Sequence, residues 1–341
     1  TNVEAARDAG VHLALFSGNE VFWKTRWENS IDGSGTPYRT LVSYKETLAD
    51  AVIDPAHPVW TGTWRDARFS PPADGGRPEN ELTGQIFRVN CCEIDMEVGA
   101  ADGDMRFWRD TRVADLSGSQ TTTVGTDIIG YEWDEDLDNG FRPAGLFRVS
   151  ETFGGNQEIL YDEGSSFGPG SATHSMTMYR APSGALVFGA GTVQWAWGLD
   201  SNHDRGGAPA DTAAQQATVN LFADMGVQPY ALMPGLVAAS ASTDTTAPTS
   251  AVTSHSSGDN VPPGSTVTLG GTAADVGGLV GGVEVSVDGG ASWRPATGRE
   301  SFSYVVSGPP GDYTIRTRAG DDSGHLETPG AGLTLSLAPQ T

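Results

Sequence analysis

The sequence predicts an α/β plus mainly β protein: the C-terminal part of a Rossmann-like α/β unit with a β-rich insertion, followed by an immunoglobulin-like (Ig-like) β-sandwich. Val11 to Phe16 is an apolar run without alternation, which is typical of a parallel strand buried on both faces. Short segments rich in aromatic and β-branched residues fill about residues 59–199 and recur over residues 251–341. Between them, residues 239–250 are small and polar, so we predict a linker there.

The charge balance limits the possible partners. The chain of 341 residues has 20 Lys and Arg against 43 Asp and Glu, and a formal net charge of -23. Phosphate binding needs a basic surface, so we expect no nucleic-acid partner and no anchoring on anionic lipid. The longest apolar run, Val11 to Phe16, is far shorter than the roughly 18 residues that a membrane span requires, so we expect no membrane insertion.

The N-terminal elements indicate that the sheet needs a further segment. The first ten residues read as the last turns of a helix that ends at Gly10, directly before the strand Val11 to Phe16. Helices are also predicted around Tyr44 to Ala51 and from Asp211 to Met225, where Asp211 is the N-cap. A single parallel strand does not start a domain, so we expect an upstream polypeptide segment or a second chain to complete the sheet. Residues 1–238 would then be the C-terminal part of a catalytic domain.

Strands are clearest where aromatic and branched residues cluster between turn residues. In the β-rich insertion they are Leu82 to Val89, Gly145 to Val149, Thr173 to Arg180 and Ala185 to Trp197. In the Ig-like part they are Thr266 to Thr272, Gly282 to Val287, Phe302 to Val306, Tyr313 to Arg318 and Leu333 to Ser336, with a turn at Asp288-Gly289-Gly290.

The two cysteines, Cys91 and Cys92, are adjacent, which excludes a disulfide framework. They are either ordinary strand cysteines or a vicinal disulfide without a catalytic role. The pair has no second cluster of Cys or His at ligand spacing, so we assign no metal ligand to this chain.

The first candidate site is Ser17-Gly18-Asn19-Glu20, directly after the buried strand. Ligands of open α/β sheets bind beyond the carboxyl ends of the strands, and the Asn19 amide can hold a carbonyl or a developing oxyanion. The alternative is that Asn19 only bonds the backbone of its own turn. Nearby, Trp23 is predicted to wall a pocket, with core packing as the alternative.

The second candidate site is the acidic run from Tyr131 to Gly140. Its carboxylates repel one another unless they are solvated, paired or bound to a cation such as calcium. An EF-hand loop that started at Asp134 would need a glycine at its sixth position and a glutamate at its twelfth, where Asn139 and Gly145 stand.

Within this run Glu132 differs from its neighbours, because Tyr131 and Trp133 flank it. We predict that these aromatic rings desolvate Glu132 and raise its pKa, as suits a general acid or base. Trp133 and, in the predicted strand Thr173 to Arg180, His174 are predicted to contact the substrate. A structural histidine is the alternative for His174.

Three segments together carry a family resemblance: residues 5–23, 130–134 and 193–199. In these, the chain resembles the large-subunit-like family of N,N-dimethylformamidase over about residues 1–237. The last ninety residues resemble Ig-like modules appended to secreted actinobacterial proteins, which implies an extracellular location.

The resemblance implies that an iron ion, held by two tyrosines and a glutamate, activates water to hydrolyse an amide. Those ligands are expected on a segment or chain upstream of Thr1, so this chain alone would hold no cofactor. The resemblance also carries a pocket asparagine over to Asn19, a pocket glutamate to Glu132 and a pocket aromatic residue to Phe167.

We therefore expect the chain to be part of a secreted hydrolase that acts on the C–N bond of a small amide, and that is active only when the missing part completes it. Asn19 and Glu132 would meet in one cavity, where Asn19 orients the carbonyl and Glu132 positions or deprotonates water. The alternative is a non-catalytic extracellular protein that binds carbohydrate or cell-wall material.

Overall fold

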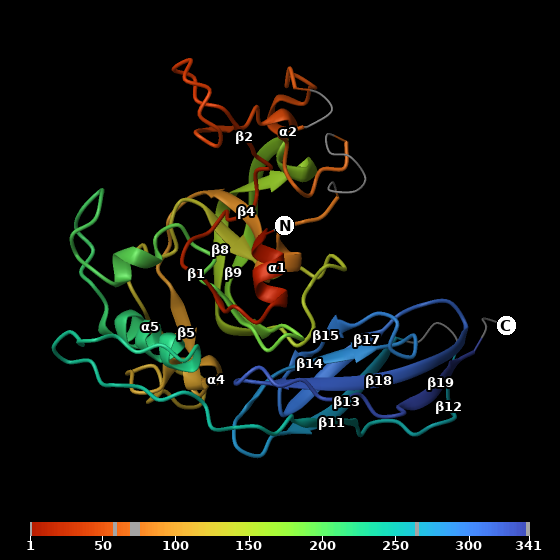
Figure 1. Ribbon diagram of the computed structural model, residues 1–341. Helices are drawn as coiled ribbons and strands as arrows, with labels where there is room; N and C mark the ends of the chain where they lie inside the picture. Colours follow the sequence, from red (N-terminus) through yellow and green to blue (C-terminus); the bar gives the residue numbers. More distant parts are fainter. Residues whose placement is uncertain (1, 57–59, 69–75, 263–265, 339–341) are drawn as a thin grey trace.

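The computed structural model describes residues 2–56, 60–68, 76–262 and 266–338. Thr1 and the predicted boundary of the β-rich region at Val59 lie outside these residues. The chain forms an N-terminal body built around one large sheet and a C-terminal sandwich of two sheets (Figure 1). Both parts are mainly β, as predicted. No helix in the described ranges has the length and apolar character needed to cross a membrane.

The large sheet of the body has six strands in the order β1-β10-β9-β7-β4-β8. Leu13 in β1 lies opposite Val187 in β10 in a parallel pair, and the other pairings are antiparallel. The first strand thus forms a parallel pair with a later strand of this chain, while the Rossmann-like arrangement stays a prediction. The strand was predicted to be buried on both faces, but β1 is only half-buried because it lies at the edge of the sheet. The strands are β1 (Leu13–Leu15), β4 (Ile86–Cys91), β7 (Trp133–Glu135), β8 (Phe147–Tyr161), β9 (Ser166–Arg180) and β10 (Leu186–Gly189).

The helices of the body are short, apart from one. They are α1 (Asn2–Asp8), α2 (Glu46–Ala49), α3 (Asn80–Thr83), α4 (Ala100–Gly103) and α5 (Thr212–Asp224), with 3-10 turns η1 (Arg106–Trp108), η2 (Asp162–Gly164) and η3 (Trp195–Gly198). Two further strand pairs are β2 (Arg26–Glu28) with β3 (Thr40–Val42) and β5 (Glu97–Gly99) with β6 (Thr121–Thr123).

The predicted ends of two helices are confirmed. Gly10 follows α1 with a φ of 92°, a left-handed conformation that glycine adopts without steric cost. Asp211 caps α5, because its side chain accepts a hydrogen bond from the Ala213 N–H. Phe222 of α5 then packs against Phe16 at the end of β1, with ring centroids 5.7 Å apart.

Two predicted strands differ from the structure because apolar content does not separate a strand from a buried turn. The segment predicted from Leu82 begins in α3, and Gly84 ends that helix with a φ of 83° before β4 starts. The segment predicted to run to Trp197 leaves the sheet at Gly189, and its tryptophans lie in η3, where Trp195 is fully buried.

The C-terminal sandwich has its own apolar core, formed between its two sheets by residues such as Leu269, Val285 and Leu335. The five predicted strands coincide with β13, β14, β17, β18 and β19 to within a few residues, and the turn at Asp288-Gly289-Gly290 leads from β14 to β15. One sheet contains β11 (Thr249–Val252), β13 (Val267–Ala274), β17 (Ser301–Val306) and β16 (Thr297–Gly298), and the other contains β12 (Asp259–Val261), β19 (Leu333–Leu337), β18 (Gly311–Asp321), β14 (Val280–Ser286) and β15 (Arg294–Pro295).

The adjacent cysteines at the end of β4 are bonded to each other, so the vicinal disulfide is the alternative that the structure contains. The backbone carbonyl of Cys92 accepts a hydrogen bond from the Trp133 indole at 3.3 Å.

Candidate functional site

The loop after β1 meets the start of β7, as the sequence predicts. Gly18 is needed there, since a Cβ on it would lie 3.0 Å from the Thr192 backbone nitrogen. The Asn19 backbone N–H donates to Asp134 Oδ1 at 3.0 Å. Its side-chain Nδ2 donates to Glu132 Oε2, also at 3.0 Å, across 113 positions of sequence. The structure therefore brings together the two residues to which the catalytic roles are assigned.

The backbone of this loop is held in an unfavourable conformation. Asn19 has a φ of 59° and Val21 a φ of 60°, both in the left-handed region. Asparagine tolerates this region, whereas a β-branched residue does so at a cost of about 1–3 kcal/mol. Hydrogen bonds from the Lys24 N–H to the Gly62 carbonyl and from the Trp64 N–H to the Phe22 carbonyl fix the chain that follows.

Replacing Val21 with glycine is expected to stabilise the protein by about 1 kcal/mol, because the relief of strain exceeds the entropy that glycine loses on folding. Urea unfolding measures this change. Val52→Gly is the matched control, since Val52 is also exposed and is not among the residues with positive φ. Equal destabilisation by both substitutions would contradict strain at Val21.

Two further carboxyls of the loop region favour their protonated forms. Burial raises the pKa of Glu20 to about 7. Burial also raises the pKa of Asp134 well above its ordinary value; the hydrogen bond from Asn19 opposes this, while the charges of Glu20 and Glu79 add to it. A carboxyl with a pKa near 7 both takes up and releases protons at neutral pH, which suits a general acid or base.

Polar atoms of this site lack partners. Asn19 Oδ1 and Glu20 Oε2 are shielded from solvent and accept no hydrogen bond. An unpaired buried acceptor destabilises the folded state by about 1–3 kcal/mol, and protein interiors rarely contain one without a ligand, water or functional role. The group Asn19, Glu20, Glu132 and Asp134 is called the carboxyl site below.

The ion pair between Arg65 and Glu79 lies close enough to the carboxyl site for both charges to act on Asp134. Arg65 binds Glu79, whose Oε1 also accepts the Phe87 N–H at 3.0 Å. The Arg65 guanidinium lies 4.8 Å from the centroid of the Phe22 ring, and its charge partly lowers the pKa of Asp134. The pair thus fixes an arginine whose charge acts on the buried Asp134.

Trp133 and His174 lie close together, but inside the core of the body. Both are fully buried, and their rings are 6.0 Å apart in an edge-on arrangement. His174 Nε2 lies 3.0 Å from the Ala190 carbonyl, and burial lowers the pKa of His174 to about 4. Their burial favours a packing role over the substrate contact predicted for them. Glu132, directly before β7, is half-buried.

The other two aromatic residues with predicted substrate roles have separate environments. Trp23 is half-buried, its ring is 4.9 Å from that of Phe22, and Lys45 Nζ lies 5.1 Å from its centroid. Phe167 is half-exposed near the turn end of the β8–β9 hairpin, opposite Leu160.

The acidic run that contains Glu132 is neutralised mainly by arginines. Asp136, with a side chain fully shielded from solvent, binds Arg142 and Arg148, each at 2.8 Å. Asp138 binds Arg294 in the sandwich at 2.6 Å. Paired charges explain how these carboxylates coexist, which removes the reason for a calcium ion in this run.

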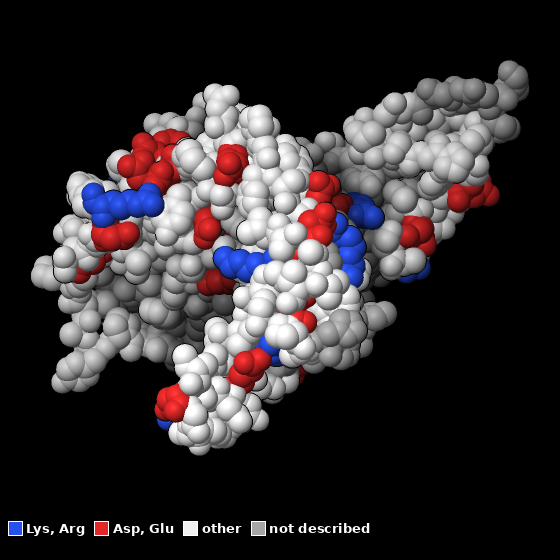
Figure 2. All heavy atoms as spheres, turned by 90° about the horizontal axis from the view of Figure 1, so that it is seen from above, with Lys and Arg blue, Asp and Glu red and all other residues white. Residues whose placement is uncertain are grey.

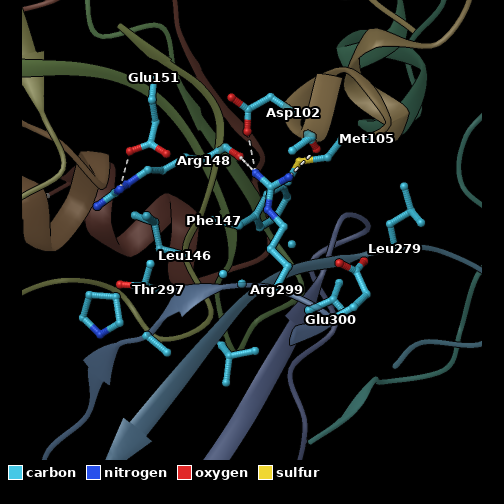
Figure 3. Close-up of a pocket in the computed structure, with 18 of the residues that line it drawn as sticks. Asp102, Met105, Leu146, Phe147, Arg148, Glu151, Leu279, Thr297, Arg299 and Glu300 are labelled. Carbon is cyan, nitrogen blue, oxygen red and sulfur yellow. Dashed lines mark hydrogen bonds and ion pairs between the residues drawn. The ribbon is translucent and has the colours of Figure 1, made fainter. Parts of the chain in front are cut away.

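A cavity of about 680 Å³ lies between the body and the sandwich (Figure 3). Arg299 crosses it to Asp102 at 2.5 Å, and Arg148 pairs with Glu151 at its rim. A second cavity of about 450 Å³ is lined by Arg65, Arg88 and the β8–β9 turn. None of the predicted site residues lines either cavity.

Charges of both signs are interspersed on one face of the molecule. On the face shown in Figure 2, Lys and Arg side chains stand beside Asp and Glu side chains and form no continuous basic area. This arrangement matches the many ion pairs that the arginines make.

The fold and site define a β-rich protein whose candidate centre is a group of half-buried and buried carboxyls at the end of a parallel strand. The chain belongs to the family described as N,N-dimethylformamidase beta subunit-like, C-terminal, whose model matches residues 1–207. This confirms the resemblance expected from the sequence, and the family description implies a partner subunit. No curated protein matches this chain.

Some solved structures resemble parts of the chain. The fibronectin(III)-like modules of CbhA from Clostridium thermocellum are 15% identical over 27% of this chain and 99% of that chain, with a TM-score of 0.24. The endo-beta-1,4-mannanase from Thermotoga petrophila is 11% identical over 29% of this chain and 21% of that chain, with a TM-score of 0.23. The sulfane dehydrogenase SoxCD from Paracoccus pantotrophus is 13% identical over 69% and 62%, with a TM-score of 0.20. At these scores the similarities carry no argument about function.

Proposed function

We propose that this chain is the C-terminal part of a secreted dimethylformamidase-like hydrolase that cleaves the C–N bond of a small amide once a partner segment or subunit completes it. The observation that carries this proposal is the contact between Asn19 and Glu132, inside a family match over residues 1–207. The buried positions of Trp133 and His174 give no support to a carbohydrate-binding surface built on them.

The roles follow from the donors and acceptors of the carboxyl site. The Asn19 amide has two N–H groups, and its bond to Glu132 uses one of them, so the other is free to bind a substrate carbonyl. Glu132 uses one carboxylate oxygen in this bond, and its second oxygen would accept a proton from the attacking water. Glu20, with a pKa of about 7, would return a proton to the departing amine.

Iron, which the resemblance implies, does not fit the carboxyl site. Ligating carboxyls must be deprotonated, whereas burial raises the pKa of both Glu20 and Asp134. Glu132 already accepts a hydrogen bond on Oε2. We therefore expect the iron ligands on the partner segment or subunit, and no step above passes through the metal.

Glu132→Gln and Asn19→Gly test the proposal in the complete protein, with amine release from dimethylformamide and other small amides as the assay. Each should lower the rate about a hundredfold with little change in Tm. Glycine keeps the left-handed backbone at position 19. Asp138→Asn, in the same acidic run but paired with Arg294, is the control and should keep the full rate. Full activity of Glu132→Gln would refute the assigned role.

A further inference from the structure

Carboxylates from three separate segments converge where the linker enters the sandwich. Asp244 lies in the linker, Asp275 follows β13, and Asp322 follows β18. Gly278 shows how close they are: a Cβ on this residue would lie 2.9 Å from Asp275 Oδ2, 2.9 Å from Asp322 Oδ1 and 3.1 Å from Asp244 Oδ2. Three carboxylate oxygens thus surround one small space.

These oxygens lack the partners that buried charges need. Asp244 Oδ2 and both carboxylate oxygens of Asp275 are shielded from solvent and accept no hydrogen bond. Asp322 Oδ1 accepts only a long bond of 3.3 Å from the Leu279 N–H. Desolvated carboxylates without a partner are strongly unfavourable, and like charges around one point add to this. None of the ion pairs among the described residues includes Asp244 or Asp275.

We propose that Asp244, Asp275 and Asp322 bind a calcium ion. Calcium takes six to eight oxygen ligands in a flexible geometry, from carboxylates, carbonyls and water, so the three aspartates would supply the charged part of this set. Asp321 and His325 lie beside the same aspartate, since ligand atoms of Asp244, Asp321 and His325 are all within 4.8 Å of one another. However, Asp321 already accepts hydrogen bonds from Ser323 and His325. We therefore expect Asp321 to lie beside the ion without binding it.

The ion would fasten the sandwich to the body. Asp322 Oδ2 accepts the Arg106 N–H of the body at 2.8 Å. Arg106 also binds Asp224 at the end of α5, and its guanidinium donates to the Ser240 carbonyl of the linker at 3.4 Å. Calcium bound to Asp244 and Asp322 would therefore connect the linker, the sandwich and α5 at one point (Figure 1).

The test is calcium titration of the full chain after treatment with a chelator, by calorimetry and by Tm. We expect saturable binding with a Kd of about 10⁻⁵–10⁻³ M and a Tm that rises by several degrees in 10 mM calcium. No heat and no Tm shift would overturn the proposal. An equal or stronger response to magnesium or zinc would also overturn it, because these ions prefer other geometries or ligands.

Two variants locate the ion. Asp275→Asn removes one ligand charge, and Gly278→Ala fills the space while all three carboxylates remain. Each should weaken calcium binding at least tenfold, whereas Asp312→Asn, an exposed aspartate of the same sandwich, should leave it unchanged. Without calcium, Asp275→Asn should keep or raise the Tm, because it removes a repelling charge. A lower Tm for this variant without calcium, together with unchanged calcium affinity, would show that Asp275 is structural and would refute the site.

Discussion

Asparagine in place of Asp136 is expected to lower the free energy of unfolding by about 3–5 kcal/mol, the usual effect of breaking a buried ion pair. The Asp136 side chain is shielded from solvent and binds both Arg142 and Arg148. Burial by itself would raise the pKa of Asp136, but the two guanidinium groups outweigh burial and lower it. Arg142 also binds Glu284 of the sandwich at 3.1 Å. Removing the Asp136 charge should therefore also weaken the junction between the body and the sandwich.

Chemical denaturation of the full chain measures this effect, and Asp138→Asn is the control two residues away. The pair of Asp138 with Arg294 is partly exposed, with side chains 29% and 42% accessible, and such pairs contribute about 0–1 kcal/mol. Because the folded pKa of Asp136 is lowered, its stabilisation is present above its ordinary pKa and is lost as the pH falls through the folded value. Similar losses for both variants would contradict a special role for Asp136.

The contact at the carboxyl site could be predicted from sequence because it depends on topology. The loop after a parallel strand opens at the carboxyl edge of the sheet, and a β-rich insertion returns to that edge. This reasoning predicts from the sequence alone that Asn19 and Glu132 lie close together, and the hydrogen bond between them agrees with it. The parallel strand and the five main sandwich strands could be predicted for a related reason, since their apolar patterns are strong.

The properties of individual carboxyls could not be predicted in this way. Glu20 and Asp134 are in the two predicted motifs, but their raised pKa values depend on burial, which nonlocal packing decides. Trp133 was expected to contact the substrate, yet its side chain is fully buried in the core. The cluster around Gly278 could not be predicted either, because Asp244, Asp275 and Asp322 come from separate segments that meet only in the folded protein.

The stability of the protein is expected to fall by about 3 kcal/mol between pH 4.5 and pH 7 because of Glu20 alone. Burial raises the folded pKa of Glu20 from 4.5 to about 7, so in this window the folded state keeps a proton that the unfolded state releases. The destabilisation caused by Glu20 is therefore absent below the pKa of the unfolded state and constant above the pKa of the folded state. Equilibrium unfolding of the full chain at a series of pH values measures the slope.

Glu20→Gln removes the titrating group and keeps the shape of the side chain, so the variant should match the parent protein near pH 4 and exceed its stability by about 3 kcal/mol at pH 8. Asp134 also has a raised pKa and remains in the variant, so the difference between the two curves isolates Glu20 and its coupling to Asp134. Glu300→Gln, at an exposed position, is the control and should follow the parent curve. If Glu20 also returns the proton to the amine, the rate of the complete protein should change around the same pH. A stability difference between the parent protein and Glu20→Gln that stays constant with pH would show that the pKa of Glu20 is not raised by folding. Glu20 would then explain neither the pH dependence of stability nor the return of a proton to the amine.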